Sequence, residues 1–227
     1  MVNVDTVYQR VLAIANKEQR GYITPLEFNL LANQVQLEIF ENYFIELNQA
    51  LAMPGNNSEY ADIVTTLNEK IGEFVDNTFL TKTGEYFTYP ANAYKLGTLY
   101  YAPGGASDFL DGVEIQEVDY NEILDYNNSP LTKPKISKPL FVHEKGRLKV
   151  FPSSISAGVK AVYTKVPDKV KWGYVVVNEQ ALYNATTSTN FELHVSEETT
   201  LVMKILGLAG IVIQRQELMA LGQQQQA

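Results

Sequence analysis

Apolar residues recur at helical spacing from the start of the chain. Between residues 4 and 19 they share one face of a helix, and Asn3 precedes them as an N-cap. Gly21 then serves as the stop of this helix. The members of the apolar face are Val4, Val7, Tyr8, Val11, Leu12 and Ala15. The pattern therefore predicts a first amphipathic helix.

A longer second helix begins at the clearest local signal in the sequence. Thr24 and Glu27 have the spacing of a capping box, and Pro25 occupies the first helical position. Ile23 and Phe28 lie where a hydrophobic staple would place them. The apolar stripe that follows comprises Phe28, Leu31, Val35, Ile39, Phe40, Tyr43, Phe44, Leu47 and Leu51. It predicts a helix of about 27 residues, roughly 40 Å long at 1.5 Å per residue.

A third helix is expected from near Ser58. Its apolar positions are Ile63, Val64, Leu67, Ile71, Phe74 and Val75. After residues 83–84 the period near 3.6 gives way to short runs rich in Tyr, Val and Thr, which are typical of strands. The expected strands cover residues 85–89, 96–101, 113–118, 140–143, 148–151, 160–165 and 174–177. Lys145 and Gly146 form a tight turn between two of them.

Two connections within this β region have their own signals. Residues 119–125 predict one or two helical turns, with Asp119 and Glu122 in cap and box positions. Residues 129–135 predict an extended connector, because Pro130 and Pro134 each bias the preceding residue away from helix.

The chain returns to helix near its end. Ser196 is expected as the N-cap, and Glu197 and Glu198 occupy the first turn, where the positive end of the helix favours them. An apolar run from Leu201 to Ile213 follows, and the chain closes with a polar tail. These patterns predict an α+β fold in which residues 1–82 form an N-terminal helical bundle. Residues 83–195 form an antiparallel β-rich insertion, and residues 196–227 form a returning helix that packs on the bundle, plus the tail.

Composition narrows the classes of function. The 227 residues carry a net charge of −8 and contain no Cys. Phosphate binding is built from clusters of Lys and Arg, so this charge argues against a nucleic-acid binder. The apolar run near the end is interrupted by Lys204 and is too short to span a bilayer, so no membrane partner is expected. The first residues lack the pattern of a signal peptide.

Reactive side chains are scarce. His143 and His194 are the only imidazoles. Ser196 lies two residues after His194, but neighbours in sequence are rarely neighbours in a catalytic triad. Asp108 and Asp111 could bind a cation, although a solvated turn is the simpler interpretation. The sequence therefore predicts a protein that is not an enzyme, with no metal site and no cofactor.

The aromatic content favours protein contacts. There are 14 Tyr and 10 Phe, whereas charged residues make up only 19% of the chain. Tyr provides a large contact area at low cost in rotamer entropy. A Tyr-rich β-sheet is the plainer explanation of the same content. The candidate interface residues are Tyr100, Tyr101, Phe109, Gln223, Gln224, Gln225 and Gln226.

The start of the chain, residues 4–8 and 18–29, resembles a group of virion proteins of tailed bacteriophages, including short-tailed and crAss-like phages. Residues 148–152, 163–167, 172–174 and 191–193 are similar to the same group. The resemblance covers nearly the whole chain and implies a structural protein without a catalytic motif. The layout of bundle, β insertion and returning helix resembles a head-to-tail adaptor or ring protein beneath the portal.

This resemblance implies a location and partners. We expect the protein in the virion, at the head-tail interface or in the tail, after assembly in the cytoplasm of the bacterial host. The implied partners are the portal protein and neighbouring tail or ring proteins, with a homo-oligomeric ring of about twelve copies. Genomic DNA would pass through without specific binding, because an acidic wall repels phosphate. The same charge also promotes solubility, which is the plainer explanation.

Other functions remain open at this point. A fibre-attachment or receptor-binding subunit would usually show repeats or a fibrous period, and neither is visible. An assembly scaffold would be more charged and more uniformly helical. Another tail or capsid-associated protein fits the composition, and a lytic enzyme fits less well because carboxylates alone do not identify a glycosidase.

Overall fold

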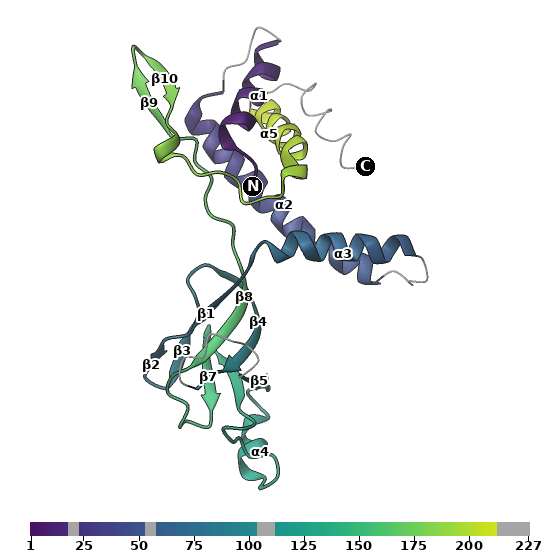
Figure 1. The fold of residues 1–227 in the computed structure, drawn as a ribbon, viewed down its shortest axis with the longest axis vertical. Coiled ribbons are helices and arrows are strands. Elements are labelled where there is room, and N and C mark those ends of the chain that lie inside the picture. Colours follow the sequence, from purple (N-terminus) through teal and green to yellow (C-terminus); the bar gives the residue numbers. More distant parts are fainter. Residues whose placement is uncertain (18–22, 53–57, 104–111, 213–227) are drawn as a thin grey trace. The chain divides into compact units, whose positions relative to one another are not determined.

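The fold is mixed α+β, as the sequence predicts. The computed structural model describes residues 1–17, 23–52, 58–103 and 112–212. It divides into two compact units (Figure 1). The helical unit comprises residues 1–73 and 167–227, and the sheet unit comprises residues 74–166.

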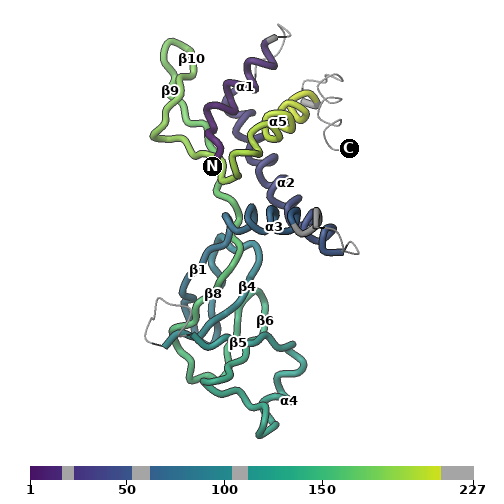
Figure 2. The backbone as a smooth tube through the Cα atoms, turned by 45° about the vertical axis from the view of Figure 1, so that its right-hand side comes forward, coloured from purple at the N-terminus to yellow at the C-terminus, as the bar shows by residue number. Residues whose placement is uncertain are grey.

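The helical unit contains four α-helices and a two-stranded sheet among its described residues. The helices are α1 (Val4–Lys17), α2 (Pro25–Ala52), α3 (Ser58–Gly72) and α5 (Glu198–Val212). The strands are β9 (Tyr174–Val177) and β10 (Gln180–Tyr183), and the 3₁₀ turns are η2 (Ala185–Thr187) and η3 (Val195–Glu197). Helix α5 packs on α1 and α2, and α3 packs on α2 (Figure 2).

The starts of the first two helices follow their capping signals. The Asn3 side-chain oxygen accepts hydrogen bonds from the backbone N–H groups of Asp5 and Thr6, at 2.8 and 3.2 Å. The Thr24 hydroxyl accepts from the Glu27 N–H, and the Glu27 carboxylate accepts from the Thr24 N–H. The Thr24 N–H and the Thr24 hydroxyl both donate to the Glu27 carboxylate, and these two hydrogen bonds lower the pKa of the Glu27 carboxyl. The capping box and Pro25 at the first position of α2 are thereby confirmed.

The buried face of α2 forms the centre of the helical unit. Its buried apolar residues include Phe28, Val35, Ile39, Phe40 and Tyr43. The end of the predicted stripe differs, because Leu51 is 64% exposed. The expected stripe is therefore buried only along the first part of the helix.

Carboxamide side chains of α2 bind an extended segment of the same unit. Asn33 makes a reciprocal pair with the backbone of Val170: its Nδ2 donates to the carbonyl oxygen and its Oδ1 accepts from the N–H, both at 2.8 Å. Asn29 makes the same pair with Trp172, at 3.2 and 2.7 Å. Gln36 donates to the carbonyl of Asp168. Every second residue of the segment 168–172 is thus hydrogen-bonded through its backbone to a side chain of α2.

The sheet unit contains one eight-stranded sheet in the order β1-β8-β4-β5-β6-β7-β3-β2. Its strands are β1 (Val75–Phe79), β2 (Lys82–Thr83), β3 (Tyr86–Thr88), β4 (Ala93–Tyr101), β5 (Val113–Glu117), β6 (Leu140–Glu144), β7 (Arg147–Phe151) and β8 (Val159–Lys165). Among the described strands, only β5 and β6 pair in parallel. A parallel pair needs a long crossover, and the connection between these strands supplies it with helix α4 (Ile123–Asn128). The antiparallel prediction holds for the other pairs.

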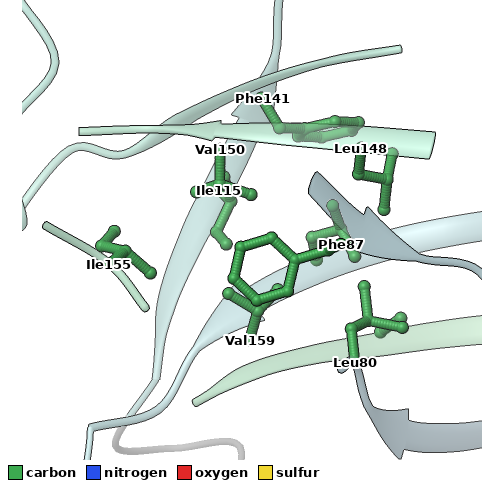
Figure 3. Packing of buried hydrophobic residues seen from close by; sticks show 10 residues of the cluster. Leu80, Phe87, Ile115, Phe141, Leu148, Val150, Ile155 and Val159 are labelled. Atoms are coloured by element: carbon green, nitrogen blue, oxygen red, sulfur yellow. The ribbon is translucent and has the colours of Figure 1, made fainter. Parts of the chain in front are cut away.

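The order of the strands requires the sheet to curl. Its two edge strands, β1 and β2, are consecutive in the chain and are separated only by Leu80 and Thr81. The curl encloses an apolar core (Figure 3). This core comprises Leu80, Phe87, Leu99, Ile115, Phe141, Leu148, Val150, Ile155, Val159 and Ala161. Gly158 allows the close approach at the rim, because a Cβ there would lie 2.6 Å from the carbonyl oxygen of Ala102.

Several local predictions are corrected by the structure. Helix α3 ends at Gly72, and Val75 begins β1 instead of continuing the helix. The strands therefore begin before the pattern change at residues 83–84, and residues 167–195 group with the helices. Antiparallel pairing of β1 with β8 overrides the helical spacing of Phe74 and Val75, because that pairing is not visible in the local sequence.

Two predicted caps are also wrong. Helix α4 begins after Glu122, which makes no side-chain capping bond, so Asp119 and Glu122 do not form the expected box. Ser196 does not cap α5 either. It lies within η3, where the His194 side chain accepts from the Ser196 N–H, and α5 begins at Glu198. The His194 imidazole thus caps the 3₁₀ turn η3 that precedes α5.

Candidate interaction surfaces

The β9–β10 hairpin exposes apolar side chains. We call residues 174–183 the hairpin arm; it projects from the helices of its unit (Figures 1 and 2). Val176 is 62% exposed. Val175, Val177 and Leu182 share one face, because Leu182 is the register partner of Val175 and alternate residues point the same way. All three are exposed.

The base of the hairpin arm is firmly attached. Trp172 is buried, and its ring centroid lies 5.8 Å from those of Tyr174 and Tyr183. The Trp172 indole N–H donates to the Asp5 carboxylate at 2.9 Å. A two-stranded hairpin is marginal in water by itself, so this anchor holds the arm in place while its apolar residues stay exposed. Such a surface is typical of a contact with another protein.

Helix α2 carries a second apolar surface, on the side away from its buried face. Leu26, Leu30 and Leu37 follow each other at spacings of four and seven residues, so they lie along one side of the helix. All three are exposed, with Leu30 at 67%. We call these three residues the outward stripe. Both sides of α2 are therefore apolar, which is unusual for a helix that borders solvent on one side.

The sheet unit carries a third surface, in the crossover between β5 and β6. Residues 129–139 form a loop with three exposed lysines, Lys133, Lys135 and Lys138, which we call the lysine loop. The same loop exposes Leu131, at 94%, and Ile136. The extended connector predicted for residues 129–135 is instead a series of turns, with a backbone hydrogen bond from Lys133 to Ser129.

The predicted interface residues fall into three groups. Tyr100 and Tyr101 lie on β4 and are half-buried, and Tyr101 packs against the core of the sheet. Tyr100 is flanked in register by Glu114 on β5 and Lys160 on β8. Phe109 and residues 223–226 lie outside the described residues. The two tyrosines are consecutive on β4 and therefore face opposite sides of the sheet, and part of Tyr101 is committed to core packing.

The first imidazole, His143, lies on β6 beside the predicted Lys145–Gly146 turn. Its Nε2 lies 3.1 Å from a Glu117 carboxylate oxygen, and its Nδ1 is hydrogen-bonded to the Tyr89 hydroxyl. Burial, with a smaller contribution from Glu117, raises the pKa of Tyr89. His143 and Glu117 are both exposed. Both ring nitrogens of His143 therefore have a partner on the surface of the sheet. Such pairing is typical of a structural role.

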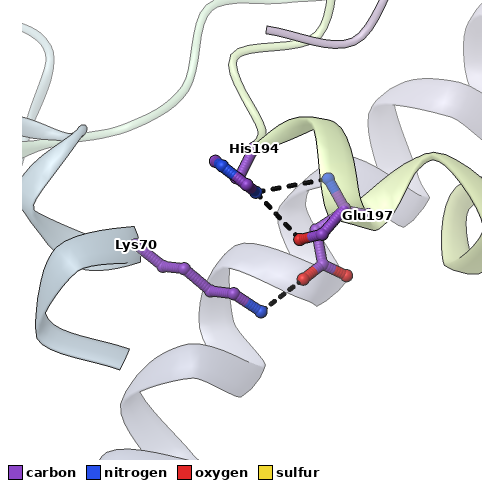
Figure 4. A network of polar contacts seen from close by, with 4 residues as sticks. Lys70, His194 and Glu197 are labelled. Carbon is purple, nitrogen blue, oxygen red and sulfur yellow. Dashed lines mark hydrogen bonds and ion pairs between the residues drawn. The ribbon is translucent and has the colours of Figure 1, made fainter. Parts of the chain in front are cut away.

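The second imidazole, His194, belongs to a polar network of the helical unit (Figure 4). Its Nδ1 lies 2.9 Å from the Ser196 hydroxyl and also accepts from the Ser196 N–H. Ser196 and His194 therefore meet as parts of a helix cap. Next to them, Lys70 of α3 forms an ion pair with Glu197 at 2.6 Å. This pair joins α3 to η3, the turn immediately before α5.

A cavity of about 670 Å³ lies beside this ion pair. It is lined mainly by α2 and α5, and Lys204 at its edge is paired with Glu38 at 2.7 Å. Burial, together with the Glu197 carboxylate, raises the pKa of Tyr43 in its wall. Both lysines that line the cavity form ion pairs with a glutamate from a different secondary-structure element. These pairs stabilise the packing of the helices on one another.

Residues 1–17, 23–52, 58–103 and 112–212 contain no cluster of three or more His, Asp or Glu side chains that could hold a metal ion. Within the same ranges no helix combines the length and the apolar character needed to cross a bilayer.

The sequence matches no protein-family model, and no curated protein is significantly similar to it.

Sequence reasoning missed both exposed apolar surfaces of the helical unit. The hairpin arm was expected only as one strand, because its turn residues Asn178 and Glu179 are not a common turn pair, although both have positive φ. The outward stripe could have been found from the leucine spacing at residues 26, 30 and 37. The amide pairs of Asn29 and Asn33 had a signal too, because the two residues are four apart on the predicted helix.

Proposed function

We propose that this protein is a structural subunit of a homo-oligomeric ring in a tailed bacteriophage, placed between the portal and the tail, where it helps to form the DNA conduit. The resemblance of the sequence to phage virion proteins suggests the location. The exposed apolar surfaces of the helical unit support assembly into a ring.

The observation that carries this proposal is the pair of apolar surfaces on the helical unit. The hairpin arm and the outward stripe belong to different elements, and both are exposed. Subunits of a ring meet through two different faces, each complementary to the face of the next copy or of a docked partner. A monomeric protein that acts on a small molecule has no need of either surface.

The distribution of charge also supports a conduit. The helical unit holds 16 of the 26 acidic residues and 8 of the 18 basic residues, so it carries the whole net charge of −8. The sheet unit holds ten of each and is neutral. An acidic unit beside the DNA path would repel the phosphate backbone and keep the genome from adhering.

The test of the proposed location is the copy number in purified virions. Quantitative mass spectrometry would give the ratio of this protein to the portal protein. A ratio near one supports a ring matched to the portal. A much larger ratio would indicate capsid decoration or fibres, and absence from the particles would contradict the proposal.

The hairpin arm gives a mutational prediction. Val176→Asp places a charge on an exposed apolar strand, so we expect the purified protein to fold normally and to fail to join particles. Incorporation is measured by complementing a phage that lacks the gene and quantifying the protein in virions. Thr186→Asp is the matched control, because it adds the same charge at an exposed position of η2 outside the arm. Equal incorporation of both variants would exclude the arm as a docking element.

A further inference from the structure

The lysine loop is built to present a fixed surface. Pro134 and Pro139 are buried, while the residues between them are exposed. Lys135 and Lys138 close a tight turn through two backbone hydrogen bonds, of 3.2 and 3.0 Å. Ile136 is held at the tip of this turn. A loop anchored in this way loses little conformational entropy when it binds a partner.

The surface of the lysine loop is both basic and apolar. Residues 129–139 contain three lysines and no acidic residue. The exposed apolar side chains are Leu131 and Ile136, which lie among these lysines in the sequence. A partner that fits this loop must offer exposed aliphatic side chains beside carboxylates.

Helix α2 offers a surface of that kind. The 28 residues of the helix include four Glu and no Lys or Arg. The outward stripe supplies Leu30 and Leu37, about 10 Å apart at 1.5 Å per residue. Glu41 follows Leu37 by one helical turn, is exposed, and lies on the same side of the helix.

We propose that the lysine loop of one copy binds the outward stripe of α2 in the neighbouring copy. Leu131 and Ile136 pack on the leucines, and the lysines face Glu41 and the acidic surface around it. The contact joins two different surfaces, so successive copies associate head to tail and the chain of contacts can close into a ring. This inference rests on the proposed function only because the contact requires a second copy of the chain.

Charge complementarity favours this partner over the others that lysines attract. A DNA backbone would use the lysines but leave Leu131 and Ile136 exposed to water. An acidic helix with exposed leucines complements both the lysines and the exposed apolar side chains of the loop. The ion pairs guide the encounter and fix its orientation, whereas the aliphatic contact supplies burial.

The contact can be tested by cross-linking, because the chain has no Cys of its own. Ile136→Cys and Leu37→Cys are introduced into one full-length chain and treated with a short bismaleimide. We expect a ladder of covalent multimers. The control combines Leu37→Cys with Lys95→Cys, an exposed position on β4 away from the lysine loop, and should give no ladder. A cross-link that forms only within single chains would overturn the proposal.

A charge exchange makes the test specific. Lys135→Glu and Glu41→Lys, each added alone to the double-cysteine chain, should reduce the multimer yield roughly tenfold, which corresponds to about 1.4 kcal/mol. The two together should restore the yield. Lys95→Glu is the control for a change of net charge and should leave the yield unchanged. Failure of the combined exchange to restore the yield would exclude this pairing.

The outcome is separable from that of the proposed function. Rings seen by electron microscopy without the cross-link would overturn this contact and leave the ring intact. A chain that stays monomeric and gives no ladder would overturn the contact, whereas the copy number in virions would still decide the location. Retention on a DNA duplex that Lys135→Glu abolishes, without any ladder, would assign the loop to DNA instead.

Discussion

Replacing Phe40 by alanine is expected to lower the free energy of unfolding of the helical unit by about 3–5 kcal/mol. The Phe40 side chain is fully buried in the centre of α2 and meets the Phe44 ring edge to face at 5.1 Å. Its removal leaves a cavity that the surrounding helices cannot fill completely. The buried Trp172, which is the only tryptophan, reports the unfolding of this unit by its fluorescence during denaturant titration.

Leu37→Ala is the matched control for this substitution. It lies on the same helix, but its side chain is exposed, so the stability should change by no more than about 0.5 kcal/mol. Similar unfolding curves for the two variants would mean that the buried face of α2 has been assigned wrongly.

The second large effect is expected from Asn33→Ala. The substitution removes both hydrogen bonds to Val170, a residue that is 2% exposed, and leaves its N–H and carbonyl oxygen without these partners. An unsatisfied buried polar group costs about 1–3 kcal/mol, and two groups are affected here. Stability should therefore fall by several times the value of one ordinary hydrogen bond, and the Val170 amide should exchange its hydrogen faster.

Gln34→Ala serves as the comparison, because Gln34 is the next residue of the helix and is exposed. It should leave both the unfolding curve and the exchange at Val170 unchanged. Normal protection of the Val170 amide in the Asn33 variant would show that the segment is held by other contacts.

The parts of the fold that depend on contacts between residues close in sequence could be predicted, and those that depend on distant residues could not. The capping box of Thr24 and Glu27 acts within four residues, so the start of α2 could be read from the sequence. The Lys145–Gly146 turn was recognisable for the same reason. Strand β1 was missed because its partner, β8, is distant in the chain, while Phe74 and Val75 continue the helical spacing locally.

The candidate surfaces were harder to predict, for a related reason. The leucine spacing indicates a second apolar side of α2 at Leu26 and Leu30, but only the three-dimensional packing shows that this side is the exposed one. The hydrogen bonds of Asn33 were not predicted, because its partner Val170 lies 137 residues away in the sequence. Tyr101 illustrates the opposite error: an aromatic residue chosen for contact with other proteins packs against the core of the sheet.

The two ends of the sheet unit meet in a single pair of strands. Val75 is the register partner of Thr164, and the Lys165 N–H donates to the Phe74 carbonyl at 2.8 Å. The chain therefore enters and leaves this unit at neighbouring points, so a short linker could join residues 73 and 167 across the gap. Evolution can therefore replace the sheet unit as a whole. Such a replacement adapts the contacts of this unit to a new neighbour without changes in the helical unit.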